Sequence, residues 1–119
     1  MPLLNTMMIA DISTNYLHAF QNRDIDALAA FLSDSVELRD WEVYAKGKQN
    51  VLEANMRIFD SFTSIELDIT NLIVMENQAA VEFTLFLRNN DNQIKLLVTD
   101  ILEFNSDGEI TTVRAYRGN

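Results

Sequence analysis

The sequence predicts one α+β domain in which N-terminal helices pack on a strongly curved, mainly antiparallel sheet. The length of 119 residues, with 48% hydrophobic and 23% charged residues, suits a single compact domain covering residues 1–119. Apolar residues follow helical spacing in the first half of the chain. After Ser61 they alternate with polar residues, which is the pattern of half-buried strands.

The first half of the chain is expected to be mostly helical. Helical spacing marks a first helix over about residues 4–20, with Ile12, Tyr16 and Phe20 on its buried stripe. Asp24 stands where a helix N-cap is expected. The elements that follow are, in order, a two-turn helix from Ile25 to Leu32, a turn at 33–35, a short strand at 36–40, a loop at 42–47 and a helix at 51–59.

The second half is expected to be a meander of four strands, at 65–75, 79–88, 94–104 and 109–116. Polar turn residues separate the strands, most clearly from Asn89 to Asn92 and from Asn105 to Gly108. Strands joined by such short connections pair antiparallel. Because they exceed the usual ~5–6 residues, they are expected to twist and bend strongly.

Composition excludes several classes of partner and site. Acidic residues number 18 against 9 basic ones, and the resulting charge of −9 argues against nucleic acid and anionic membranes as partners. No cysteine occurs, so disulfides and thiolate metal sites are excluded, and a reducing, cytoplasmic location is expected. His18 is the only histidine, which excludes a histidine metal cluster or a catalytic triad. We expect no metal and no cofactor, and any chemistry would rest on carboxylates and tyrosines.

Asp100 interrupts an otherwise apolar row. One face of the strand at 94–104 carries Ile94, Leu96, Val98, Asp100, Leu102 and Phe104. A carboxylate in that row is costly unless it is paired, hydrogen-bonded or protonated, and desolvation would raise its pKa and make it a hydrogen-bond donor. The alternatives are a bulged strand or an ion pair with an arginine of a neighbouring strand, namely Arg88, Arg114 or Arg117.

Two further residues are candidates for a pocket. Asp40 shares a strand face with Val36 and Leu38 at the point where the strand ends, and Trp41 follows it. A carboxylate there suits the rim of a pocket, although an ordinary turn aspartate has the same pattern. Tyr16 lies on a buried helical stripe, where its hydroxyl needs a partner, and the alternative is a core tyrosine without a catalytic role.

The segments NYLHAFQNRDIDALAAFLSDSVELRDW, AAVEFTLFL and VTDILEFNSDGEITTVRAYRG carry a family resemblance. Over about Asp11 to Gly118 the chain resembles the SnoaL-like and ketosteroid isomerase branch of the nuclear transport factor 2-like superfamily, also called the cystatin-like cone. This resemblance implies a cone with an internal pocket. The isomerases carry a tyrosine on the first helix, an aspartate at the end of the first strand and an aspartate on a late strand. In this chain Tyr16, Asp40 and Asp100 match those three positions.

The resemblance implies acid–base catalysis on a small apolar ketone. Asp40 would move a proton from the carbon beside the carbonyl to a position two carbons along, as a steroid delta-isomerase does. Tyr16 and a protonated Asp100 would donate hydrogen bonds to the dienolate oxygen. One alternative is a SnoaL-like polyketide cyclase with a more polar pocket, and another is a non-catalytic cone that binds a small ligand or forms dimers. The aspartate–arginine–aspartate arrangement of limonene epoxide hydrolases is not evident.

The residues expected to line the pocket are Trp41, Met56, Phe83, Leu85, Val98, Leu102, Val113 and Arg117. Two of them depart from the isomerase pattern. Met56 stands near the position of a tyrosine that supports the catalytic one, and Arg117 replaces an aromatic residue of the cavity. If Arg117 points inward, it could pair with Asp40 or Asp100, or adapt the pocket to an acidic substrate.

The opposite face of the sheet is expected to mediate self-association. Its residues Thr84, Phe86, Leu97, Thr99 and Ile101 leave it partly apolar, and no helix remains in the chain to cover it. Such a patch favours association, and members of the resembled family often pair through this face. A homodimer is therefore expected.

Overall fold

The structure is a computed structural model that describes residues 4–119. It contains three helices and six strands. In chain order these are α1 (Thr6–Gln21), α2 (Ile25–Phe31), β1 (Leu32–Arg39), β2 (Tyr44–Lys46), α3 (Lys48–Ser61), β3 (Ser64–Met75), β4 (Gln78–Asn89), β5 (Asn92–Phe104) and β6 (Ile110–Arg117). The predicted α+β class, with helices first and a meander of strands afterwards, is confirmed.

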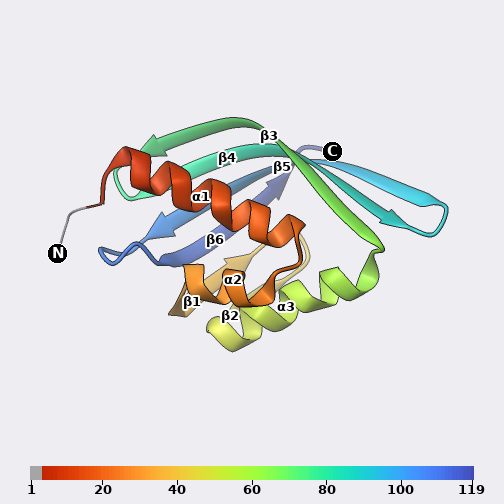
Figure 1. Ribbon diagram of the computed structural model, residues 1–119, viewed down its shortest axis with the longest axis horizontal. Coiled ribbons are helices and arrows are strands. Elements are labelled where there is room, and N and C mark those ends of the chain that lie inside the picture. The colour runs from red at the N-terminus through yellow and green to blue at the C-terminus, as the bar shows by residue number, and fades with distance from the viewer. Residues whose placement is uncertain (1–3) are drawn as a thin grey trace.

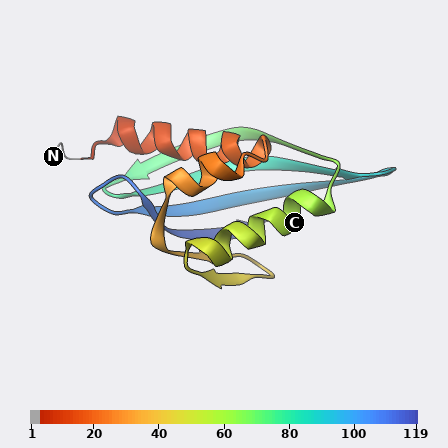
Figure 2. The same ribbon diagram turned by 60° about the horizontal axis from the view of Figure 1, so that its bottom comes forward.

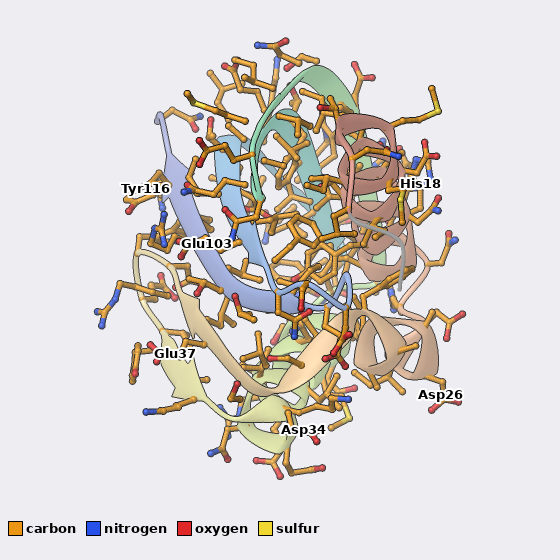
Figure 3. The ribbon with its side chains drawn as sticks, turned by 90° about the vertical axis from the view of Figure 1, so that its left-hand side faces the viewer. His18, Asp26, Asp34, Glu37, Glu103 and Tyr116 are labelled. Atoms are coloured by element: carbon orange, nitrogen blue, oxygen red, sulfur yellow. The ribbon has the colours of Figure 1, made fainter. Side chains whose placement is uncertain are left out.

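All six strands form one curved, open sheet in the order β2-β1-β6-β5-β4-β3. Neighbouring strands are antiparallel except β1 and β6, which are parallel. Figure 3 looks along the sheet and shows it bending around the helices, with Tyr116, Glu103 and Glu37 on the convex side and His18 beyond the helices. The helices therefore occupy the concave side.

The helices cover different parts of this concave side. Helix α1 packs on β3 and β4, whereas α3 packs on β1 and β2, and α2 contacts both α1 and α3 (Figure 1). The hairpin of β4 and β5 extends past the helices at one end (Figures 1 and 2), which gives the molecule extents of 49 × 29 × 22 Å. Helices α1 and α3 therefore pack mainly on the two outer pairs of strands and less on β5 and β6 between them.

Local sequence signals explain where the helices begin. Asn5 Oδ1 accepts from the Met8 amide at 2.9 Å, and Asp24 Oδ1 accepts from the Ala27 amide at 3.1 Å. The predicted N-cap at Asp24 is thus confirmed. Gly47 precedes α3 with φ of 89°, a conformation that costs glycine little because it has no Cβ atom.

Two expectations about the first half are wrong. Residues 33–35 form no separate turn, because β1 begins at Leu32 directly after α2. Instead the register of β1 against β6 shifts between the pairs Leu32–Ile110 and Glu37–Thr112, so the turn-type residues lie in a strand irregularity. The expected loop at 42–47 contains β2, which has only three residues and is too short to show an alternating pattern.

The core confirms the predicted alternation of β5. Its buried face carries Leu96, Val98, Asp100, Leu102 and Phe104, whereas Leu97 between them is 48% exposed on the convex side. Fully buried side chains from α2, β1, β4 and β6 pack together behind this row, among them Leu28, Leu32, Val36, Val81 and Ile110. Within residues 4–119 no helix is long and apolar enough to cross a membrane.

We expect Leu28→Ala to lower the free energy of unfolding by about 2–5 kcal/mol, because it opens a cavity where α2 meets the core. Met7→Ala, at a side chain that is 74% exposed on α1, is the matched control and should change it by less than about 0.5 kcal/mol. Urea denaturation followed by circular dichroism measures both. An equal effect of the two substitutions would contradict this description of the core.

Candidate functional site

A pocket of about 340 Å³ lies between the concave face of the sheet and helices α1 and α3. This volume falls at the small end of the roughly 300–1,000 Å³ that is common for small-molecule sites. Most of its lining is apolar and comes from Leu17, Phe20, Leu38, Trp41, Val43, Ile58, Phe62, Phe83, Leu85, Leu87, Ile94, Leu96, Val98, Val113 and Ala115. The polar lining residues are Tyr16, Asp40, Glu42, Asn55, Asp100 and Arg117.

Tyr16 reaches the pocket from the buried stripe of α1, and only 4% of its surface is exposed. Burial raises the pKa of its hydroxyl far above the usual value, and the charge of Asp100 raises it further. The phenol therefore keeps its proton at any physiological pH. It is available as a hydrogen-bond donor.

Asp100 enters the pocket from the middle of β5, between Val81 of β4 and Ala115 of β6. Its surface is 6% exposed. Desolvation by these apolar surroundings, followed by repulsion from Asp40, raises the pKa of its carboxyl to about 7. A large fraction of Asp100 is therefore a neutral carboxylic acid at neutral pH, and that form can donate a hydrogen bond.

The alternative ion pair of Asp100 with an arginine is not formed within the part of the chain that the structure describes. Arg114 binds Glu103 at 2.7 Å on the convex side. The Arg117 Nε atom donates to the main-chain oxygen of Asn119 at 2.5 Å. Asp100 also pairs in regular register with both neighbouring strands, which excludes a bulge at this position.

The polar atoms of Tyr16 and Asp100 face open space in the pocket. Neither side chain hydrogen-bonds to another residue in the range 4–119. In that range no buried side-chain nitrogen or oxygen atom lacks a hydrogen-bond partner. The unpartnered oxygen atoms of Tyr16 and Asp100 therefore keep some accessible surface. Unpartnered polar groups in an apolar wall are suited to bind a ligand, because the ligand supplies the missing hydrogen bonds.

Asp40 lies one residue beyond the end of β1 and combines the two roles that the sequence left open. Its Oδ1 accepts from the amides of Glu42 and Val43 at 2.7 and 2.6 Å, as a turn aspartate does. Its carboxylate also lines the pocket and repels the charge of Asp100. The turn therefore fixes Oδ1, whereas Oδ2 makes no hydrogen bond to residues 4–119.

Trp41 and Arg117 form part of the pocket rim. The Arg117 guanidinium carbon lies 5.7 Å from the centre of the Trp41 ring, which is within the range of a cation–π contact. Arg117 does line the pocket, together with Asp40 and Asp100. No ion pair joins it to either carboxyl among the described residues, so the linked aspartate–arginine–aspartate arrangement is not formed.

Two residues expected in the lining are not there. Met56 is 37% exposed on α3, and the helical rotation instead turns its neighbours Asn55 and Ile58 toward the pocket. Leu102 is fully buried beyond Asp100 on β5, in the core behind the pocket. The other expected lining residues, Trp41, Phe83, Leu85, Val98, Val113 and Arg117, do line it.

Among the polar lining residues, sequence reasoning missed the exposed Glu42 and the buried Asn55. Asn55 is 4% exposed, and its Nδ2 atom donates to the main-chain oxygen of Val51 at 2.9 Å. The signal was present, because Asn55 lies on the buried stripe of its helix just as Asp100 lies in an apolar strand row. Within residues 4–119 no group of three acidic, histidine or cysteine side chains is placed to hold a metal ion.

The arrangement of polar groups suits proton transfer in an apolar environment. Two neutral donors, Tyr16 and protonated Asp100, belong to the same pocket as a carboxylate held by its turn, Asp40. Donors in such a wall stabilise a developing oxyanion more strongly than water does, because they are already oriented. A carboxylate at the rim can act as the base.

We expect the Asp100 side-chain carboxyl to titrate near pH 7 in ¹³C NMR. In Asp40→Asn its pKa should fall, because repulsion between the two carboxylates is removed, but it should stay above the ordinary aspartate value because desolvation is the larger cause. Asp26→Asn, at the exposed start of α2, is the control and should leave it unchanged. An ordinary aspartate titration at Asp100 would contradict the described environment.

Solved structures share this fold at low sequence identity. An LEH-like epoxide hydrolase from M. tuberculosis matches with a TM-score of 0.85 and 22% identity, over 95% of this chain and 84% of the other. A putative ketosteroid isomerase from Kribbella flavida matches with a TM-score of 0.81 and 22% identity, over 96% and 80%. A putative hydroxylase, AclR from Streptomyces galilaeus, matches with a TM-score of 0.81 and 10% identity, over 96% and 81%.

These likenesses establish the fold alone. The three neighbours share it, although each is described by a different activity. No curated protein matches the chain. The family model of the SnoaL-like domain matches residues 14–113, a range that contains Tyr16, Asp40 and Asp100. The match spans most of the sequence, and with it the resemblance noted in the sequence is confirmed. This protein belongs to the SnoaL-like domain family.

Proposed function

We propose that this protein catalyses proton transfer on a small apolar ketone, most concretely the isomerisation of a β,γ-unsaturated ketone to its conjugated isomer. The observation that carries the proposal is Asp100, a buried carboxyl that hydrogen-bonds to no other residue of the range 4–119 and opens into an apolar pocket beside Tyr16. Asp40, at the rim, supplies the carboxylate that such a reaction needs.

In the proposed reaction Asp40 removes the proton from the carbon between the carbonyl and the double bond. The electron pair of the broken C–H bond moves toward the ketone and forms a dienolate. Tyr16 and neutral Asp100 donate hydrogen bonds to its oxygen while negative charge develops there. Asp40 then returns the same proton to the far carbon of the former double bond, which leaves a conjugated enone and the starting form of the enzyme.

The lining favours this reaction over the cyclase alternative. A polyketide carries many oxygen atoms that need polar partners, whereas this pocket is walled mainly by leucine, valine, isoleucine and phenylalanine. Its small volume also favours a compact ketone over a long chain. The pKa of Asp100 adds a pH dependence: the donor form is lost as pH rises through about 7, so turnover should decline on the alkaline side.

We expect the protein to convert a 5-ene-3-ketosteroid, or the smaller cyclohex-3-enone, to the conjugated enone, which is followed by its ultraviolet absorbance. Asp40→Asn should lower the rate roughly 10²- to 10⁴-fold because the base is lost. Tyr16→Phe and Asp100→Leu should each lower it roughly 10²- to 10³-fold because one oxyanion donor is lost. Asp26→Asn, on the exposed side of α2 (Figure 3), should leave it unchanged.

The same assay distinguishes the non-catalytic alternative. Saturable binding of either ketone without turnover, or equal rates in the wild-type protein and Asp40→Asn, would overturn the proposed catalysis. A rate that falls in Asp40→Asn but not in Asp100→Leu would support Asp40 as the base and would contradict the role of Asp100 as an oxyanion donor.

We also propose that two copies of this chain associate through the convex face of the sheet. Leu97 and Tyr116 are 48% and 56% exposed there, and no helix of residues 4–119 lies over them. A dimer is expected in sedimentation equilibrium at micromolar concentration. Leu97→Lys should weaken it, whereas Met7→Lys, at an exposed apolar residue of α1, should not. A wild-type monomer at that concentration would contradict the proposal.

A further inference from the structure

The orientation of the Asn55 amide is fixed by its own helix. Its Nδ2 atom lies 2.9 Å from the main-chain oxygen of Val51. A carbonyl oxygen only accepts hydrogen bonds, so the amide must present its nitrogen to Val51 and cannot be exchanged end for end. The Asn55 Oδ1 atom therefore points away from Val51.

The Asn55 Oδ1 atom is an acceptor without a donor. No residue in the described range donates a hydrogen bond to it. Because no buried side-chain polar atom in that range lacks a partner, the unpartnered Oδ1 atom must keep some accessible surface. The residue is 4% exposed and lines the pocket, so this surface opens into the cavity. A buried amide oxygen costs free energy until a water molecule or a ligand donates to it.

We propose that Asn55 selects substrates that carry a hydroxyl or N–H group in addition to the ketone, with its Oδ1 atom accepting the hydrogen bond. The three inner polar groups are complementary, because Tyr16 and neutral Asp100 donate whereas Asn55 Oδ1 accepts. They also come from different elements, α1, β5 and α3. A ketone that also carries a hydroxyl or N–H donor satisfies all three.

Burial makes this contact selective. Glu42 and Arg117 also belong to the lining, but both are exposed, so water competes for their hydrogen bonds. Asn55 is enclosed, and a ligand without a donor would exclude water from its Oδ1 atom and leave that oxygen unpaired. The placement of the ketone at Tyr16 and Asp100 rests on the proposed function, whereas the acceptor role of Asn55 does not.

Trp41 allows a direct test, because it is the only tryptophan in the chain and lines the pocket. Its fluorescence is titrated with 4-(4-hydroxyphenyl)cyclohexanone and with 4-phenylcyclohexanone, which differ by one hydroxyl group. The wild-type protein should bind the hydroxylated ketone about tenfold more tightly. In Asn55→Leu, a substitution of similar size, the two dissociation constants should become equal within about twofold, as a lost hydrogen bond requires.

A matched control, Asn50, lies five residues earlier on α3. Asn50 makes the same type of bond, from Nδ2 to the main-chain oxygen of Lys46 at 2.9 Å, but its side chain is exposed to solvent. Asn50→Leu should keep the wild-type preference. Asn55→Ala provides a second variant that cannot crowd the pocket, and thermal melting by circular dichroism shows that each variant is folded.

The ratio of the two dissociation constants decides the proposal. A wild-type protein without preference, or an equal preference in wild type and both Asn55 variants, would overturn it. Equal weakening of both ligands in Asn55→Leu would also overturn it, because that result indicates a positioning role for Asn55. Tyr16→Phe tests the placement of the ketone separately. If this variant bound both ketones as tightly as the wild-type protein, and Asn55→Leu still removed the preference, the acceptor role of Asn55 would stand and the proposed function would be contradicted.

Discussion

The pocket exists because three helices cannot fill the concave side of so strongly curved a sheet. Helix α1 packs on β3 and β4, and α3 packs on β1 and β2, so neither fully covers β5 and β6 between them. Close packing is the rule in protein interiors, and a gap of about 340 Å³ is large by that measure. Long β5 supplies much of its wall, and the position of every candidate residue follows from this gap.

Asp100 is the feature that makes this apolar gap a candidate site. A valine or leucine at that position would complete the row of β5 and would avoid the cost of desolvating a carboxyl. No arginine neutralises it within residues 4–119, and nearby Asp40 makes ionisation harder still. Such a local conflict with folding is typical of functional positions, where an unfavourable group is kept for its chemistry.

The sequence was sufficient to predict those parts of the fold in which apolar residues recur with a clear helical or strand period. The apolar alternation of β5 located Asp100 correctly, and Asp24 marked the start of α2. The start of β1 was missed, because Ser33, Asp34 and Ser35 favour a turn locally. In the structure they lie in an irregular part of the strand, between the residues that pair with β6 at Leu32 and Glu37. Asn55 was missed as a pocket residue although a helix was predicted at 51–59, since only the packing of α3 shows that this part of the helix faces a cavity and not solid core.

The pKa of Asp100 has a thermodynamic consequence for any ligand that accepts its hydrogen bond. Near neutral pH the free protein is a mixture of two protonation states, and such a ligand binds only the protonated one. Binding is then accompanied by the uptake of less than one proton per ligand molecule, on average, from the solution. The apparent affinity for the ligand therefore weakens as pH rises. The heat measured by calorimetry would include the ionisation enthalpy of the buffer, so titrations in phosphate and in Tris would differ although the contacts in the pocket are identical.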